Sequence, residues 1–325
     1  MNVAIIGCGL IGRKRAAALG GHRLVAAVDV CQEKAAALAE NHPGAVSGRH
    51  WREAAIRPDV DIVIVATTNN WLAPITLAAV EAGKHVLVEK PAARNAGELE
   101  AVMEASVRQQ ALVKVGFNLR FHPALRKARE IVDSGVLGPL MFVRGRYGHG
   151  GRPGYDREWR ADPGIAGGGE LLDQGIHLID LSRWFLGEFV QAEGFINTYY
   201  WNMPVEDNAF LLLKTDAGQA AWLHVSCTEW KNLFSFEIYG KRGKLHVEGL
   251  GGSYGTERLV FYKMLPCMGL PETVAWEYYR SGSSWQEEFD EFARAIQEGR
   301  QPDGNLYDAK AALDIIGKIY GESEK

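Results

Sequence analysis

Cysteine is scarce in this chain, and none of it stands at a spacing that binds metal. The 325 residues hold four cysteines, at positions 8, 31, 227 and 267, and no CxxC motif. Scattered cysteines in a chain of this length indicate a reducing compartment. Apolar runs never approach the roughly 18 residues that span a bilayer, and the basic residues 13–15 follow the first apolar run, which is the wrong order for a signal peptide. We therefore expect a cytoplasmic protein with no membrane partner.

An excess of basic charge is lacking as well. Lysine and arginine number 36 against 40 acidic residues, which gives a formal net charge of -4 and argues against nucleic acid as a partner. Internal repeats and low-complexity segments are also missing. The composition is that of an ordinary globular protein, and a domain holds about 100–200 residues, so the length predicts two domains.

Strand and helix signals alternate over the first 120 residues. Short apolar runs predict strands at 3–6, 24–28, 61–66, 85–88 and 112–115. Helical stretches separate them at 10–20, 32–40, 72–82 and 95–109. This alternation is typical of βαβ units and a parallel sheet. We therefore predict an α/β fold whose residues 1–120 form a Rossmann dinucleotide-binding domain.

The pattern changes after residue 120. Helices are expected at 122–134, 169–186, 284–298 and 306–320. Strand-like runs are expected at 139–147, 189–200, 207–215, 219–228, 233–239, 244–248 and 258–263. Turn signals such as 216–218 separate them, which favours hairpins. Residues 121–325 therefore predict a second, α+β domain with a mostly antiparallel sheet.

A glycine motif follows the first predicted strand and opens the first predicted helix. Gly7, Gly9 and Gly12 form a GxGxxG, with Leu10 and Ile11 inside it. Such glycines allow a tight turn, close approach of a pyrophosphate and close packing of helix on strand, while the helix N-terminus offers N–H groups to the phosphates. A glycine turn in another kind of α/β protein is the alternative, and the register of strand, motif and helix disfavours it.

The second strand ends in an acidic residue that bears on the choice of cofactor. Asp29 follows Gly9 by 20 residues, where a carboxylate accepts hydrogen bonds from the adenosine ribose. A carboxylate there repels a 2′-phosphate, and residues 30–32 supply no arginine to offset it. We therefore expect NAD rather than NADP. Cys8 lies inside the motif, and we assign it no chemistry.

Two further groups of residues are candidates for catalysis. Lys90, within Glu89-Lys90-Pro91, ends a predicted parallel strand, and ligands bind beyond the carboxyl ends of such strands. A lysine there can hold a hydroxyl and carry a proton, although a solvated surface lysine fits its position equally well. Asp173 and His177 stand four residues apart on a predicted helix, so they share one face. They form a plausible general base with its orienting carboxylate; from spacing alone, a buried core histidine is the stronger alternative, and metal ligation is another.

Three blocks together resemble one family. GCGLIG at 7–12, EKP at 89–91 and GGGELLDQGIH at 167–177 match, in order and spacing, the glucose–fructose oxidoreductase/inositol dehydrogenase (Gfo/Idh/MocA) family. The similarity is strong over about 1–125 and 159–187. It implies a Rossmann domain followed by a domain with a large open sheet. It also implies oxidation or reduction of a secondary hydroxyl of a sugar, cyclitol or sugar nucleotide.

The resemblance also implies roles for single residues. Lys90 would be the catalytic lysine beside a proline that is often cis, His177 the acid/base, and Asp173 the group that orients substrate or His177. The nicotinamide half of the cofactor would lie along Thr67, Asn69, Glu89, Lys90 and Asn118. The segment 66–72 departs from the family pattern, because Thr68 and Leu72 replace a usual proline and histidine.

A cluster of arginines gives the one clue to the substrate. Arginines 144, 146, 152, 157 and 160 stand among Tyr147, Tyr155 and Trp159. Arginine suits phosphate, and aromatic faces suit sugar rings or bases. We therefore predict a sugar nucleotide or sugar phosphate. Among the roles that the family resemblance implies, oxidation at C3 of a nucleotide-linked hexose is preferred. The expected substrate-binding residues are Lys90, Arg120, Arg146, Tyr147, Trp159, Arg160, Asp173 and His177. The alternative is a solvated loop whose arginines pair with Asp156, Glu158 and Asp162.

Other functions remain open at this point. One is a dehydrogenase of a free cyclitol or sugar, and another is a non-catalytic dinucleotide-binding sensor or scaffold. A metal-dependent lyase or hydrolase built on Asp173, His177 and Asp180 lacks a fourth ligand, so no metal is expected. The resemblance implies pairing of subunits through the outer face of the second-domain sheet. Aromatic strands around residues 195–201, 222 and 234–236 favour this, and we expect a homodimer or homotetramer.

Overall fold

The computed structural model describes residues 1–279 and 283–323, and the chain forms two compact units. The first unit comprises Met1–Phe117, Gly164–Gly167 and Trp285–Leu313; the second comprises Asn118–Pro163, Gly168–Ser284 and Asp314–Lys325. The long N-terminal segment of the first unit ends at Phe117, close to the expected boundary at residue 120. The C-terminal part departs from the expected ranges, because residues 285–313 group with the first unit.

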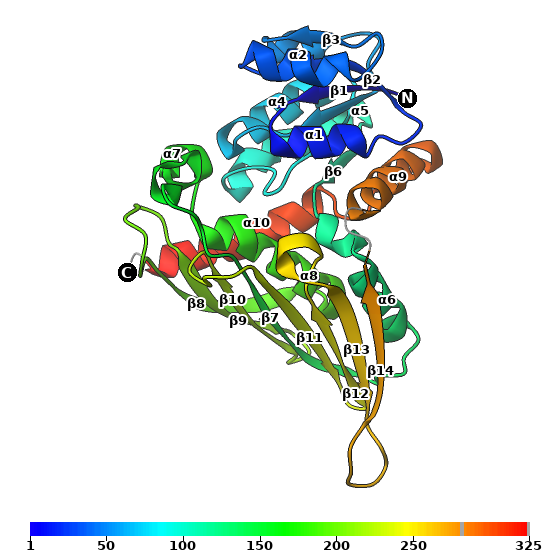
Figure 1. Ribbon diagram of the computed structural model, residues 1–325, viewed down its shortest axis with the longest axis vertical. Helices are drawn as coiled ribbons and strands as arrows, with labels where there is room; N and C mark the ends of the chain where they lie inside the picture. The colour runs from blue at the N-terminus through cyan, green and yellow to red at the C-terminus, as the bar shows by residue number, and fades with distance from the viewer. Residues whose placement is uncertain (280–282, 324–325) are drawn as a thin grey trace. The chain divides into compact units, whose positions relative to one another are not determined.

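The first unit is built on a six-stranded, wholly parallel sheet with strand order β3-β2-β1-β4-β5-β6 (Figure 1). The strands are β1 (Asn2–Ile6), β2 (Arg23–Val28), β3 (Val46–Gly48), β4 (Ile62–Val65), β5 (His85–Val88) and β6 (Val113–Val115). This is the strand order of a doubly wound dinucleotide-binding fold, and it confirms the Rossmann prediction. Chain order reverses between β1 and β4, and ligands of such sheets bind beyond the carboxyl ends there.

Helices join these strands in the alternating pattern that the sequence predicts. They are α1 (Leu10–Ala17), α2 (Gln32–Glu40), α3 (Trp51–Ala55), α4 (Asn69–Glu81) and α5 (Glu100–Gln109). The strands are apolar because both faces of the sheet are covered; all four residues of β4 are fully buried. The helix α9 (Ser283–Glu298) adds Phe289 and Phe292 to the same core, beside Ile5 and Leu24. These two rings explain why α9 groups with the first unit.

The second unit contains an eight-stranded sheet with order β14-β13-β12-β11-β7-β10-β9-β8. Its strands are β7 (Leu140–Gly148), β8 (Phe189–Asn197), β9 (Asn208–Thr215), β10 (Ala220–Ser226), β11 (Leu233–Gly240), β12 (Gly243–Glu248), β13 (Glu257–Lys263) and β14 (Glu272–Tyr278). Every neighbouring pair is antiparallel except β7 and β10, which run parallel. The large, mostly antiparallel sheet is therefore confirmed, and β14 is an addition that the sequence reading missed.

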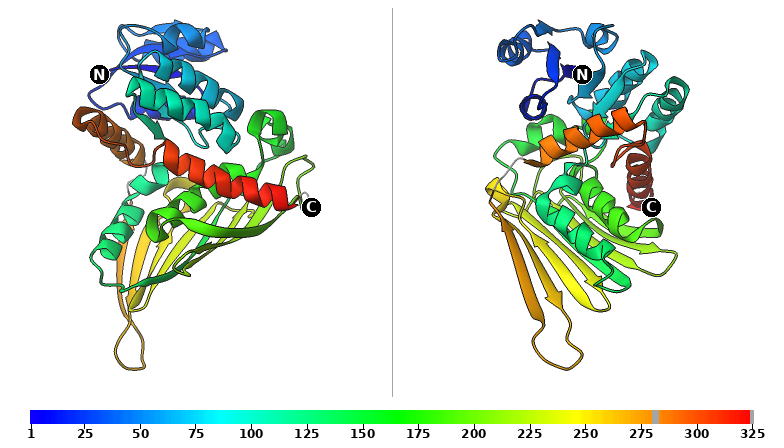
Figure 2. Two further views of the ribbon diagram at one scale, coloured as in Figure 1. Left: turned by 180° about the vertical axis from the view of Figure 1, so that it is seen from behind. Right: turned by 90° about the vertical axis from the view of Figure 1, so that its right-hand side faces the viewer.

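Helices cover one face of this sheet. The helices α6 (Pro123–Asp133) and α8 (Ile176–Leu186) lie on that face, and in the described part of the chain the opposite face carries no helix (Figure 2). Gly145 on β7 marks the covered face, because a Cβ there would meet Leu178 of α8 at 3.3 Å. The last helix, α10 (Leu306–Ser323), begins in the first unit and ends in the second. Within the described ranges, no helix is both long and apolar enough to cross a membrane.

Candidate active site

Each of the three glycines of the GxGxxG motif is required at its position for a different structural reason. Gly7 follows β1 with φ +98°, and a Cβ there would lie 2.3 Å from the Ala66 carbonyl oxygen. A Cβ at Gly12 would lie 1.9 Å from the Gly7 carbonyl oxygen, so Gly12 is required for packing of α1 on the turn. A Cβ at Gly9, in contrast, would meet no atom within 4 Å. The open space at Gly9 is what a closely approaching pyrophosphate needs.

The start of α1 fits the same ligand. Gly9 is the N-cap, and it provides no side chain to cap the helix. The first intrahelical bond runs from Arg13 N–H to the Gly9 carbonyl, so the N–H groups of Leu10, Ile11 and Gly12 lie in the uncapped first turn. Such a turn, at the positive end of the helix dipole, suits phosphate oxygens. The residues present therefore fit a dinucleotide.

Asp29 is held in place at the carboxyl end of β2. Its two carboxylate oxygens accept hydrogen bonds from the backbone N–H of Cys8 at 2.8 Å and of Cys31 at 2.9 Å. Each oxygen keeps a further lone pair, so the carboxylate can also accept a ribose hydroxyl. The sequence-based prediction considers only residues 30–32 as a source of an arginine near Asp29. In the structure Arg49 lies near this turn, and its Nε donates a hydrogen bond to the Val30 carbonyl at 3.2 Å. Burial, with the Asp29 charge second, raises the pKa of the Cys8 thiol to about 12, in keeping with no chemistry at Cys8.

The segments after β4 and β5 lie at the same edge of the sheet. Glu89 extends β5, its N–H donating to the Val65 carbonyl at 2.9 Å, and the Lys90–Pro91 peptide is cis, as the resemblance implies. Thr67 follows β4 and is half-buried. The Asn69 side-chain amide donates to the Ala166 carbonyl at 2.8 Å and so fixes the short segment 164–167 of the first unit. Leu72, which replaces the usual histidine of the resembled family pattern, is fully buried in α4 and packs in the core.

In the second unit, His177 lies in a buried aromatic setting. The Tyr147 ring stands edge-on to the His177 imidazole, with 6.0 Å between centroids, and 5.6 Å from the Tyr254 ring. Burial first, and then the neighbouring Tyr254, raise the pKa of the Tyr147 hydroxyl well above its ordinary value, so Tyr147 stays neutral. Tyr147 and His177 therefore belong to one cluster, as the predicted substrate set requires. The sequence does not single out Tyr254. It lies at the end of the short helical turn Gly252–Tyr254 that follows β12, and no motif in the sequence marks it.

The helix that carries Asp173 and His177 departs from simple α geometry. Leu171–Gly175 form a π-helical turn that runs directly into α8. A π-turn has more residues per turn than an α-helix, so the i, i+4 argument for a shared face does not carry over directly, and such turns are frequent at functional sites. Arg160 reaches Asp173, with 3.4 Å between Nε and Oδ2. Trp159 packs on the Arg160 guanidinium at 4.5 Å from the ring centre.

A second acidic group lies one turn before Asp173. Glu170 is buried and accepts a hydrogen bond from the Tyr155 hydroxyl at 2.8 Å, and His149 Nε2 lies 3.4 Å from the same oxygen. Burial lowers the pKa of His149, but the hydrogen bond and charge of Glu170 outweigh it and leave that pKa raised. The sequence reading missed Glu170 and His149, although Glu170 stands inside the GGGELLDQGIH block.

The predicted arginine cluster is dispersed. Arg144 pairs with Glu237 and Arg152 with Glu158. Arg146 alternates with Tyr147 on β7 and is exposed, so it lies on the face of the sheet opposite Tyr147. Arg120 forms a bidentate, buried ion pair with Asp180, at 2.9 and 2.6 Å. Arg160 is the predicted arginine whose ion pair with Asp173 is described above. Asn118 opens the short helix Asn118–Phe121 that precedes α6.

The triple glycine before the helix is explained by packing within the second unit at two of its positions. A Cβ at Gly168 would lie 2.0 Å from the Tyr320 hydroxyl, and one at Gly169 would lie 2.0 Å from the Glu206 carbonyl oxygen. The Glu206 carboxylate also accepts hydrogen bonds from the N–H of Leu171 and from the Tyr320 hydroxyl, both at 2.9 Å. Glu206 and Tyr320 therefore fix the start of the helix that carries Asp173. Packing against Tyr320 and Glu206 therefore accounts for glycine at positions 168 and 169 without a bound ligand.

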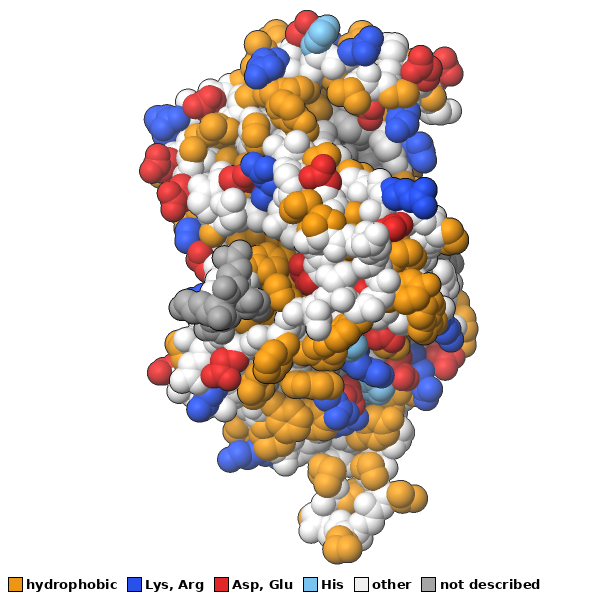
Figure 3. Space-filling view, turned by 90° about the vertical axis from the view of Figure 1, so that its left-hand side faces the viewer, with side chains coloured by type: hydrophobic (Ala, Val, Ile, Leu, Met, Phe, Trp, Pro, Cys, Tyr) orange, Lys and Arg blue, Asp and Glu red, His pale blue; other side chains and the backbone are white. Residues whose placement is uncertain are grey.

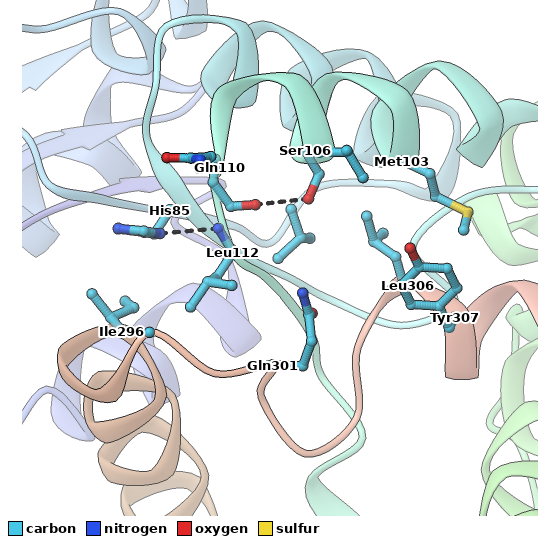
Figure 4. A pocket seen from close by; sticks show the side chains of 13 residues that line it. His85, Met103, Ser106, Gln110, Leu112, Ile296, Gln301, Leu306 and Tyr307 are labelled. Atoms are coloured by element: carbon cyan, nitrogen blue, oxygen red, sulfur yellow. Dashed lines mark hydrogen bonds between the residues drawn. The ribbon is translucent and has the colours of Figure 1, made fainter.

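A separate hollow of about 530 Å³ lies at the amino ends of β5 and β6 (Figure 4). His85, Ser106, Gln110, Gln301 and Tyr307 line it together with aliphatic side chains, and its lining includes no acidic, lysine or arginine residue. His85 Nδ1 accepts a hydrogen bond from the Leu112 N–H at 3.0 Å. This hollow is at the wrong end of the strands for the cofactor and offers no charge to a pyrophosphate. Among the described residues, no three His, Cys, Asp or Glu side chains gather as a metal site.

Comparison with known proteins identifies the same two units. Residues 1–117 match the model of the oxidoreductase family with an NAD-binding Rossmann fold, and residues 125–246 match that of the GFO/IDH/MocA C-terminal domain. Levoglucosan dehydrogenase of Pseudarthrobacter phenanthrenivorans is 31% identical over 67% of this chain and 59% of its own length. Inositol 2-dehydrogenase of Rubrobacter xylanophilus is 30% identical over 77% of this chain and 72% of its own.

The first three curated relatives are matched over only 57 to 64% of their lengths. Among solved structures, levoglucosan dehydrogenase in complex with NADH and levoglucosan has a TM-score of 0.89, covering 100% of this chain and 97% of that one. Its identity of 24% shows the fold alone. The first unit is thus an NAD-binding Rossmann domain, and the chain belongs to the Gfo/Idh/MocA family of oxidoreductases.

Proposed function

We propose that this protein is an NAD-dependent dehydrogenase that oxidises a secondary ring hydroxyl of an uncharged sugar or cyclitol. The observation that carries the proposal is the edge of the first sheet, where the open turn at Gly9 and the fixed Asp29 carboxylate accompany Lys90 at the end of β5. Relatives named for levoglucosan and inositol support the substrate class.

The proposed division of labour follows from the chemistry of each group. Oxidation removes a hydride from the carbinol carbon and a proton from its oxygen. The first turn of α1 and Asp29 would hold NAD, which would supply the hydride acceptor. The Lys90 ammonium donates a hydrogen bond to the reacting oxygen and stabilises the developing negative charge. His177 accepts the hydroxyl proton, and Asp173 orients the substrate or the imidazole. The product is a ketone, and the proton leaves through His177.

The substrate class is revised from the sequence-based prediction for a physical reason. Arg144, Arg152 and Arg120 are engaged by acidic partners of the chain itself. A phosphate would have to compete with those carboxylates, so the arginine cluster no longer favours a phosphate-linked sugar. A nucleotide- or phosphate-linked hexose remains the second candidate, because Arg160, stacked on Trp159, is partly exposed.

A substrate panel separates these candidates. Purified protein is incubated with NAD and, separately, myo-inositol, levoglucosan, common monosaccharides, their phosphates and nucleotide-linked hexoses, and NADH absorbance is followed. The proposal predicts NADH formation with at least one uncharged ring polyol and none with its phosphate. Activity confined to nucleotide-linked sugars would establish the second candidate. If NADH binds but neither oxidation nor the reverse reduction of keto-sugars is seen, the sensor interpretation replaces both.

We also propose that the bare face of the second-unit sheet pairs with a second copy of the chain. Phe142, Phe195, Leu212 and Trp222 are exposed on its strands, and Leu212 stands directly opposite Trp222. Hydrophobic side chains also cover the loop that joins β13 and β14, at the lower end of Figure 3, where Met268 and Leu270 are almost fully exposed. Several large exposed apolar side chains on one face, interspersed with charged ones such as Arg144 opposite Trp222, are typical of interfaces. The scattered cysteines favour the cytoplasm as the compartment of the assembly.

A further inference from the structure

A buried guanidinium joins the cofactor helix to the end of β5. Arg15 lies on α1, and its side chain has no exposed surface. Its Nε donates to Glu89 Oε1 at 2.6 Å, and its Nη1 donates to Glu288 Oε2 at 2.5 Å on α9. The ring of Trp285 packs on it at 4.4 Å. Three elements of the first unit therefore meet at one positive charge.

The contact with Glu89 depends on a glycine beneath it. A Cβ at Gly116 would lie 2.8 Å from both Arg15 Nη2 and Glu89 Oε2, so only the bare backbone of Gly116 leaves room for the pair. The guanidinium cannot lose its proton, and Glu89 is almost fully buried. Burial raises the pKa of Glu288, although the neighbouring Arg15 charge acts in the opposite direction.

The position of Glu89 relates this pair to the cofactor. In a doubly wound sheet, the half that includes β1 and β2 binds one mononucleotide, and the half that includes β4, β5 and β6 binds the other. Gly9 and Asp29 belong to the first half, which leaves the nicotinamide for the second. Glu89 directly follows β5 in that second half, one residue before Lys90.

We propose that Arg15 is a positioning residue for the nicotinamide half of the cofactor, acting through Glu89. It fixes the Glu89 carboxylate in one orientation, and it does not itself contact the dinucleotide. The proposal rests on the proposed NAD-dependent function. A purely structural role, in which Arg15 only anchors α9 through Glu288, is the alternative.

Binding of two ligands distinguishes these roles without any substrate. NADH carries the nicotinamide half, and ADP-ribose lacks the nicotinamide ring. Dissociation constants of both are measured for Arg15→Met, Glu89→Gln, the double variant, Glu288→Gln and the exposed control Arg13→Met on the same helix. Arg15→Lys keeps the charge with fewer donors, and it serves if Arg15→Met fails to fold.

Arg15→Met and Glu89→Gln are each expected to weaken NADH binding about tenfold, which corresponds to about 1.4 kcal/mol. The double variant should be no weaker than either single variant, because both remove one interaction. ADP-ribose binding should stay within about twofold, Arg15→Lys should fall between wild type and Arg15→Met, and Glu288→Gln and Arg13→Met should leave both constants unchanged.

Equal weakening of NADH and ADP-ribose by Arg15→Met, or additive losses in the double variant, would overturn the proposal in favour of a structural anchor. The same holds if Glu288→Gln reproduces the loss of NADH binding. Turnover separates this proposal from the function itself. If NADH affinity alone is lost and the wild-type protein oxidises no sugar, the dehydrogenase function is contradicted and the role of Arg15 stands. If the wild-type protein turns over normally and Arg15→Met weakens NADH and ADP-ribose binding equally, the role of Arg15 is contradicted and the dehydrogenase function stands.

Discussion

Gly9 and Gly12 illustrate how one motif serves both fold and ligand. Gly12 is needed because the Gly7 carbonyl oxygen occupies the space that a Cβ would take, whereas Gly9 faces open space and has φ −69°, which any residue adopts. The GxGxxG spacing predicts the turn after β1 and the start of α1, and its role in binding the pyrophosphate stays a prediction. It does not separate the two glycines, because that difference depends on the atoms around each one.

The two glycines should therefore respond differently to one added methyl group. Gly9→Ala is expected to leave the free energy of unfolding unchanged and to weaken NADH binding about tenfold or more, because the methyl group fills the space of the pyrophosphate. Gly12→Ala is expected to destabilise the protein by about 1–3 kcal/mol through overpacking. Denaturant unfolding and NADH titration of both variants test this pair. Loss of stability in Gly9→Ala, or unaltered NADH affinity, would contradict it.

Glu170 and His149 show where residue-level prediction ends. The sequence places Glu170 in a family block, but His149 meets it only because the end of β7 lies beside the π-turn. Arg15 meets Glu288 across 273 residues of chain for the same reason. No spacing in the sequence reports such pairs. Their partners are fixed by tertiary packing alone.

The His149–Glu170 pair should make stability depend on pH. Since the pKa of His149 is raised in the folded protein, the stabilisation is complete below the unfolded value, near 6.5, and disappears as pH rises through the folded pKa. His149→Gln should therefore cost about 1 kcal/mol of unfolding free energy at pH 6 and progressively less above neutrality. Denaturant unfolding of both proteins across this range measures the difference. A cost that grows with pH would refute the pairing.

At the scale of elements, long and strongly patterned segments are predicted well. The apolar runs that become β1, β2, β4 and β5 are found to within two residues at each end. The elements missed include β3, α3 and α7 (Pro163–Ala166), which have three, five and four residues, and β14, whose first four residues are exposed. Short or exposed elements are held by their neighbours, so their own sequences carry little periodicity. The parallel pairing of β7 with β10 has no local signal either.

The assignment of α9 to the first unit can be tested directly. Phe292 is fully buried in the core that contains β1 and β2, whereas Arg294 on the same helix is exposed. Phe292→Ala should cost about 3–5 kcal/mol of unfolding free energy, and Arg294→Ala should cost less than about 0.5 kcal/mol. Chemical denaturation of the two variants provides the comparison. Similar, small costs for both would mean that α9 is not part of this core.

At the scale of the whole molecule, the two units carry different residues of the proposed site. The first holds the dinucleotide motif and Lys90, and the second holds Asp173 in the π-turn and His177 on α8. The helix α8 covers one face of the second sheet, and the other face carries no helix among the described residues (Figure 2). A sheet with one face covered by helices and the other rich in exposed hydrophobic side chains has surface left to bury. The expected homodimer or homotetramer is the simplest way to bury it.

A charge on the bare face should prevent that assembly. Trp222→Glu is expected to give a monomer with an unchanged fold, because an acidic group opposite Leu212 opposes burial of the patch. Gln297→Glu, on the exposed side of α9, introduces the same charge elsewhere and should leave the assembly intact. Light scattering at micromolar concentration gives the mass of each protein. A monomeric wild type, or an oligomeric Trp222→Glu protein, would count against this interface.

Turnover and cofactor affinity of Lys90→Met test the central claim most directly. With the sugar or cyclitol that the substrate panel identifies, the account predicts a fall in kcat of about a hundredfold or more, because proton handling at the reacting oxygen is lost. It also predicts an NADH dissociation constant within about threefold of wild type, since the glycine turn and Asp29 are untouched. Unchanged kcat in a folded variant would contradict the catalytic role of Lys90 and the proposed reaction with it.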